Sequence, residues 1–262
     1  MTAIEAAPAA AKLSFGPVIQ GTFGVLKRNL GTFVALAVLL EGLPVLLIGA
    51  GVMQMTPNAP FAGFGYLGVG YLAMLAASAI LTPALVHGAV ADLNGRKSTL
   101  GECLQSGVRH ALPVFVIMLL SGLGAMLGFI LFIVPGVMLL IAWSVAGPCQ
   151  VVERTGILAA FGRSRALTKG SRWRIFWLFV LYSIVSSAVQ QSLLGVASML
   201  PRAAALNSAN PLSAITPAYV VVMVILSLAS ILITYTGLAV IYYELRRIKE
   251  GIGPEALASV FD

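Results

Sequence analysis

Long apolar stretches dominate the chain, and short polar or basic segments separate them. An α-helix rises 1.5 Å per residue, so roughly 20 apolar residues cross the roughly 30 Å hydrocarbon core of a bilayer. Six stretches approach or exceed this length, at about 30–52, 66–89, 112–132, 137–152, 175–200 and 218–243. We therefore expect an all-α polytopic membrane protein, with six transmembrane helices in a single helical membrane domain, 1–262.

The fourth stretch is the least regular of the six. It is short, and it contains Pro148, which removes a helical hydrogen bond and favours a kink. The tripeptide at 134–136, Val-Pro-Gly, interrupts the apolar pattern just before it. We expect the chain to turn at 134–136 and the fourth helix to be kinked or tilted.

Composition supports the membrane interpretation. Hydrophobic residues make up 59% of the chain, charged residues only 10%, and the mean hydropathy is +0.98. Soluble domains contain about 25% charged residues, so a water-soluble fold of this length would have too few charged side chains to cover its surface. The net charge of +7 then indicates membrane orientation rather than nucleic-acid binding.

The basic residues fall almost entirely on one side of the expected spans. Every Lys and Arg except Arg202 lies in the N-terminal segment, the connections between spans 2 and 3 or spans 4 and 5, or the C-terminal tail. Short cytoplasmic loops are enriched in Lys and Arg. This bias predicts an even number of spans with both termini in the cytoplasm.

A weak repeat divides the chain into three units. An amphipathic stretch with basic residues precedes each pair of spans, at 15–29, 99–110 and 156–169. A helix with one apolar and one basic face lies in the membrane interface, where anionic lipid attracts it. We expect three interfacial helices, in units 13–90, 98–152 and 156–250, followed by a cytoplasmic tail at 251–262.

Two segments resemble a known family. The stretch 153–178, ERTGILAAFGRSRALTKGSRWRIFWL, and the tail 242–261, YYELRRIKEGIGPEALASVF, are similar to the glycerophosphoryl diester phosphodiesterase membrane-domain family and related bacterial inner-membrane proteins. The stretches 92–101 and 132–136 fit the same family. The resemblance implies a bacterial inner-membrane location. It does not imply the enzymatic activity of the fused members, because this chain lacks the catalytic barrel and has only two histidines.

Glu41 is the one acidic residue that falls in the middle of an expected span. Intramembrane carboxyl groups are costly and face a protein interior or a wet cavity. One interpretation is a proton or cation site in a transporter, which would share a polar interior with Gln190 and Gln191 of the fifth span. The other is a carboxyl group that fixes helix packing beside the Gly42–Pro44 kink.

The densest charge cluster lies between the fourth and fifth spans. It contains Arg163, Arg165, Lys169, Arg172 and Arg174. Arginine matches phosphate oxygens with paired donors, so this cluster indicates capture of an anionic lipid headgroup. Topology alone explains such a cluster equally simply.

No pattern in the chain indicates catalysis. Serines lack a His–acid arrangement, the two cysteines form no metal-ligand cluster, and no phosphate-binding loop is present. We expect no enzymatic activity, no cofactor and no nucleic-acid partner. The leading hypothesis is a non-enzymatic inner-membrane protein that interacts with anionic lipid or supports envelope integrity. The alternative is a small-molecule or lipid transporter with Glu41 as its polar site. The sequence leaves open a protein partner or a homo-oligomer.

Overall fold

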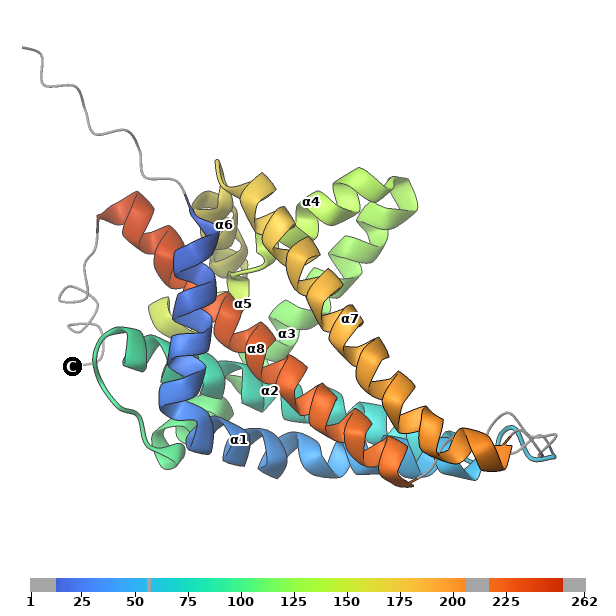
Figure 1. Ribbon diagram of the computed structural model, residues 1–262. Helices are drawn as coiled ribbons and strands as arrows, with labels where there is room; N and C mark the ends of the chain where they lie inside the picture. Colours follow the sequence, from blue (N-terminus) through green and yellow to red (C-terminus); the bar gives the residue numbers. More distant parts are fainter. Residues whose placement is uncertain (1–12, 56–57, 206–216, 252–262) are drawn as a thin grey trace, which may run out of the picture.

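Helices form every regular element of the part of the chain that the structure describes. The computed structural model describes residues 13–55, 58–205 and 217–251, and the predicted tail lies outside them beyond Gly251. In chain order the helices are α1 (Phe15–Gln54), α2 (Phe64–Leu93), α3 (Leu100–Leu131), α4 (Ile133–Trp143), α5 (Ala146–Glu153), α6 (Ile157–Thr168), α7 (Arg172–Ala205) and α8 (Pro217–Glu250) (Figure 1).

Six helical stretches within the described residues are long and apolar enough to cross a membrane. They are α1, α2, α3, the α4–α5 pair, the Arg172–Leu193 part of α7 and the Val221–Glu250 part of α8. The predicted all-helical class is therefore confirmed for the described residues, and the number of candidate spans agrees with the prediction. The orientation of the two termini stays a prediction.

α1 bends sharply at Asn29. This residue has the non-helical angles φ −114° and ψ 16°, which separate an N-terminal segment, 15–28, from the apolar remainder (Figure 1). The Asn29 amide donates to the carbonyl of Val25 at 3.0 Å and to Asp92 at 2.9 Å. Arg28 also donates to Asp92, at distances of 2.5–3.1 Å. The carboxylate at the end of α2 thus holds the bend in α1.

The three predicted amphipathic stretches take three different forms. The first is the segment of α1 before the bend, and the third is the separate helix α6. The second runs into its span without interruption, because α3 is one continuous helix. α3 begins at a capping box, in which Thr99 and Glu102 bond to each other's backbone N–H groups. The interfacial position of these segments stays a prediction.

The turn between α3 and α4 lies slightly earlier than predicted. Phe132 separates the two helices, and Pro135 falls in the first turn of α4, where its missing N–H leaves no hydrogen bond unmade. The helices approach closely because Gly128 faces Gly136, and a Cβ on Gly128 would lie 2.8 Å from the Gly136 Cα. Any larger side chain at position 128 would push the hairpin apart.

The predicted irregularity of the fourth span is a complete break between α4 and α5 at Ser144 and Val145. Pro148 explains it, since its ring removes a donor and clashes with the carbonyl four residues earlier. The break leaves the carbonyl of the buried Ala142 without a backbone donor from its own helix. The Ser164 hydroxyl of α6 donates to this oxygen at 2.8 Å, so α6 holds the interrupted span in place.

The main core lies between α1 and α2 and extends to α8. Phe33 and Leu36 of α1 are fully buried with Leu81 and Leu85 of α2. α7 packs far less tightly. Only 11% of its apolar span is buried inside the molecule, against 56% for α2. In Figure 1, α7 lies at the outside of the molecule and approaches α8 along part of its length. α7 therefore contributes little to the main core.

Candidate functional site

Glu41 is completely buried between α1 and α2. The Ser78 hydroxyl of α2 donates a 2.6 Å hydrogen bond to Glu41 Oε1, and Thr82 donates to the carbonyl of Ser78 at 2.7 Å. Within the described residues, Glu41 Oε2 has no hydrogen-bond partner. The carboxyl group thus joins two neighbouring helices and retains one unpaired oxygen.

The two glutamines predicted to share the interior of Glu41 lie elsewhere. Gln190 is half-buried and lines a groove between α7 and α8, and Gln191 is exposed. The residue that does meet Glu41 is Ser78, which the sequence analysis missed. A serine in an Ala-rich span is too common to single out, and only the packing of α1 on α2 reveals it.

The predicted basic cluster divides into separate sites, and Arg163 belongs to an ion-pair cluster. Its Nε donates to Glu153 at 2.8 Å, and its Nη2 pairs with Glu250 at the end of α8. Arg246 binds Glu250 at 2.8 Å, and the Tyr242 hydroxyl donates to Glu153 at 2.9 Å. We call these five residues the α5–α6–α8 ion cluster.

Charge in the ion cluster is compensated internally. Burial disfavours the charged form of Arg163, but its hydrogen bonds with Glu153 and Glu250 outweigh burial and raise the pKa of Arg163. The two carboxylates face the two guanidinium groups of Arg163 and Arg246. This arrangement ties α6 to α8 and commits the Arg163 guanidinium to carboxylates of the protein rather than to an external anion.

A second set of basic residues surrounds a surface cavity of about 350 Å³ beside α6. The described residues that line it are Gly162, Arg165, Ala166, Lys169 and Arg172, and none of them is acidic. We call this cavity the basic pocket. It brings together three of the five predicted cations from the end of α6 and the start of α7.

Two further features make the basic pocket electropositive. Lys249 of α8 donates to the carbonyl of Ala166, which adds a fourth cation at its edge. Arg172 Nε is buried and has no hydrogen-bond partner among the described residues. Charged groups and an unpaired donor without an acidic counterpart favour an anionic ligand.

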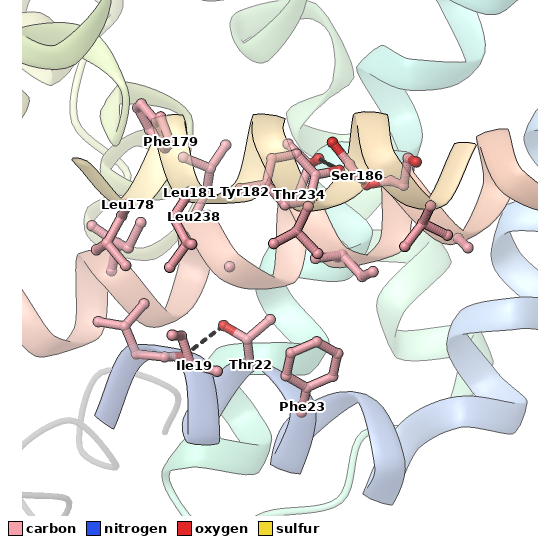
Figure 2. A pocket seen from close by; sticks show the side chains of 18 of the residues that line it. Ile19, Thr22, Phe23, Leu178, Phe179, Leu181, Tyr182, Ser186, Thr234 and Leu238 are labelled. Carbon is pink, nitrogen blue, oxygen red and sulfur yellow. Dashed lines mark hydrogen bonds between the residues drawn. The ribbon is translucent and has the colours of Figure 1, made fainter. Parts of the chain in front are cut away.

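Arg174 faces a different direction. Its Nη1 donates to the carbonyl of Leu13, just before α1, at 2.8 Å. Beyond it, side chains of α1, α7 and α8 line a groove of about 360 Å³, which we call the α1–α7–α8 groove (Figure 2). The sequence analysis did not predict this groove, because it needs three helices from the two ends of the chain.

In the described part of the chain, no three His, Cys, Asp or Glu side chains are close enough together to hold a metal ion. Both cysteines, Cys103 and Cys149, are buried and unpaired with each other. Comparison of the chain with family models, curated proteins and solved structures gave no match.

Proposed function

We propose that the protein is a non-enzymatic, multi-pass inner-membrane protein that binds anionic phospholipid at the basic pocket and so supports the integrity of the cell envelope. The observation that carries this proposal is the basic pocket itself. Arg165, Lys169 and Arg172 line one cavity with no described acidic residue among them.

The position of the basic pocket in the chain supports a lipid ligand. It lies between the broken span α4–α5 and the apolar helix α7. Trp173, adjacent to Arg172, is 71% exposed. Exposed tryptophans favour the headgroup level of a bilayer, so a phosphate group at that depth would meet the pocket. The resemblance to the glycerophosphoryl diester phosphodiesterase membrane-domain family agrees with a bacterial inner-membrane location.

The test is native mass spectrometry of the purified protein in gentle detergent with added phosphatidylglycerol. The Arg165→Gln/Lys169→Gln variant removes two cations from the basic pocket. Each basic residue near an anionic lipid surface contributes about 1 kcal/mol, so affinity should fall on the order of thirty-fold. Phosphatidylcholine should bind equally to both proteins.

The matched control is Arg96→Gln/Lys97→Gln, in the connection between α2 and α3. Both residues are exposed, and their replacement changes the net charge by the same amount. If the two variants lost the same affinity for phosphatidylglycerol, only the total charge of the protein would matter for binding. Unchanged binding in the Arg165→Gln/Lys169→Gln variant would reject the basic pocket as the lipid site.

The alternative is transport of a proton or cation, and one observation favours it. Glu41 is fully buried, and its Oε2 lacks a partner among the described residues. Under this hypothesis, vesicles containing the protein and an internal pH-sensitive dye would acidify under a membrane potential. Glu41→Gln would abolish the flux. Equal dye traces for wild type, Glu41→Gln and empty vesicles would reject proton transport.

A further inference from the structure

The α1–α7–α8 groove is an apolar channel that opens on the surface of the spanning helices. Leu178, Leu181 and Val185 line it from α7, and Phe23 lines it from the first segment of α1 (Figure 2). Leu181 is 43% exposed, Val185 52% and Phe23 56%. Exposed apolar side chains on a membrane-spanning helix contact lipid, so the groove is accessible from the bilayer.

Three hydroxyl groups of the groove bond to protein atoms. The Tyr182 hydroxyl donates to the Ser230 carbonyl at 3.1 Å, and the Thr234 hydroxyl donates to the same carbonyl at 2.7 Å and lies 3.0 Å from the Tyr182 hydroxyl. Thr22 donates to Val18 within its own helix at 2.7 Å. No described lining residue has a buried polar atom without a partner. The groove therefore favours a largely apolar occupant.

The length of the groove matches one acyl chain. Its lining on α7 runs from Leu178 to Gln190, a helical rise of about 18 Å. This is close to one leaflet of the hydrocarbon core, roughly 15 Å.

The end of the groove nearest α6 carries a group that can bind phosphate. Arg174 precedes Leu178 by four residues, so the two side chains lie on the same face of α7. One Arg174 N–H binds the Leu13 carbonyl at 2.8 Å. A guanidinium has five N–H donors, so others remain for an anion. Trp177, 54% exposed, lies at the same level and marks the headgroup region.

We infer that the α1–α7–α8 groove is a binding site for one acyl chain of a phospholipid, whose phosphate group contacts Arg174. This site is separate from the basic pocket and does not depend on it. The bound chain fills the space that loosely packed α7 leaves beside α1 and α8. It thereby supplies packing contacts that the protein does not make itself.

The test uses the full chain in phosphatidylcholine vesicles that contain a trace of phosphatidylcholine with a diazirine in the middle of one acyl chain. Illumination attaches the probe to nearby side chains, and mass spectrometry of peptides maps the attachment. Label should concentrate on the groove faces of α7 and α8. Ala229→Trp places an indole in the groove, so label there should fall roughly tenfold, because the space for the chain is filled.

Ala188→Trp is the matched control, since Ala188 is exposed on α7 and does not line the groove. It should leave the labelling unchanged. The Arg165→Gln/Lys169→Gln variant should also leave it unchanged, which separates this inference from the proposed function. Three results would overturn the acyl-chain site: label spread evenly over all exposed apolar surfaces, equal labelling of the two Trp variants, or groove label that disappears as the protein-to-lipid ratio rises, which would indicate that a second copy covers the groove.

Discussion

The Ser78 hydroxyl donates a 2.6 Å hydrogen bond to Glu41 Oε1, which joins α2 to α1 across 37 residues of sequence. Both side chains are buried where α1 packs against α2. The hydrogen bond gives Glu41 one defined partner. It explains how an acidic residue is accommodated in an otherwise apolar helix.

Ser78→Ala should destabilise the protein, because both oxygens of the Glu41 side chain would then lack a partner. Polar contacts within membrane domains contribute about 1 kcal/mol on average, so we expect a loss of this size in thermal unfolding in detergent. Ser187→Ala, on the exposed face of α7, is the control and should leave the unfolding temperature unchanged. If the Ser78→Ala protein unfolded at the same temperature as the wild type, this hydrogen bond would contribute nothing to stability.

Glu153→Gln should loosen the connection of α5 and α6 to α8. It removes a negative charge that two guanidinium groups and Tyr242 share, while the side-chain volume stays the same. Because the cluster is mostly buried, we expect about 2 kcal/mol of destabilisation in thermal unfolding.

The control for this variant is Glu244→Gln. Glu244 pairs with Arg247 at 2.9 Å, and the Arg247 side chain is 53% exposed. Exposed ion pairs contribute about 0–1 kcal/mol, so the unfolding temperature should change little. If both variants lost the same stability, the ion cluster would have no special role.

Ser164→Ala should weaken the attachment of α6 to the broken fourth span. The Ala142 carbonyl would lose the hydrogen bond from the Ser164 hydroxyl at 2.8 Å and keep only the longer contact with the Thr168 hydroxyl at 3.4 Å. We expect a loss of about 1 kcal/mol and faster amide hydrogen exchange in α4 and α5. Ser183→Ala, exposed on α7, should show neither effect. Unchanged exchange around the break would show that α6 does not stabilise it.

The predicted orientation can be tested with single cysteines in a chain carrying Cys103→Ser and Cys149→Ala. Arg96→Cys lies in the exposed α2–α3 connection, and Asn58→Cys lies in the exposed connection between α1 and α2. The positive-inside bias places position 96 in the cytoplasm. A membrane-impermeant maleimide should therefore label position 58 in intact cells and position 96 only after lysis. The reverse pattern would invert the topology.

Several elements could be predicted from the sequence because they depend on local composition. The length of an apolar segment determines whether it can span a bilayer. Pro148 predicts an irregular fourth span whatever helices that span packs against, because proline disturbs the helix locally. The exact turn after α3 was misplaced by a few residues, because Pro135 is compatible with the first turn of a helix and therefore does not have to end one.

The candidate sites could be predicted only in part. Residue type alone marked Arg163 and Arg165 as equivalent cations two positions apart. On α6 the two face different directions. Arg163 meets Glu250, 87 residues away in the chain, while Arg165 lines the basic pocket. A helix turns about 100° per residue, so neighbours in sequence meet different partners, and the partners come from distant segments.

The sequence alone thus determined the membrane class, the six spans, the asymmetry of basic charge and the presence of a carboxyl group at position 41. These properties depend on the free energy of transferring each residue from water to lipid, and this free energy is set by the residue itself and its neighbours in sequence. Only the tertiary structure decided that Glu41 meets Ser78, that Arg163 pairs with Glu250, and that α7 leaves a groove beside α1 and α8. These properties depend on which helices pack together, and hydropathy carries almost no information about that choice when every helix is apolar.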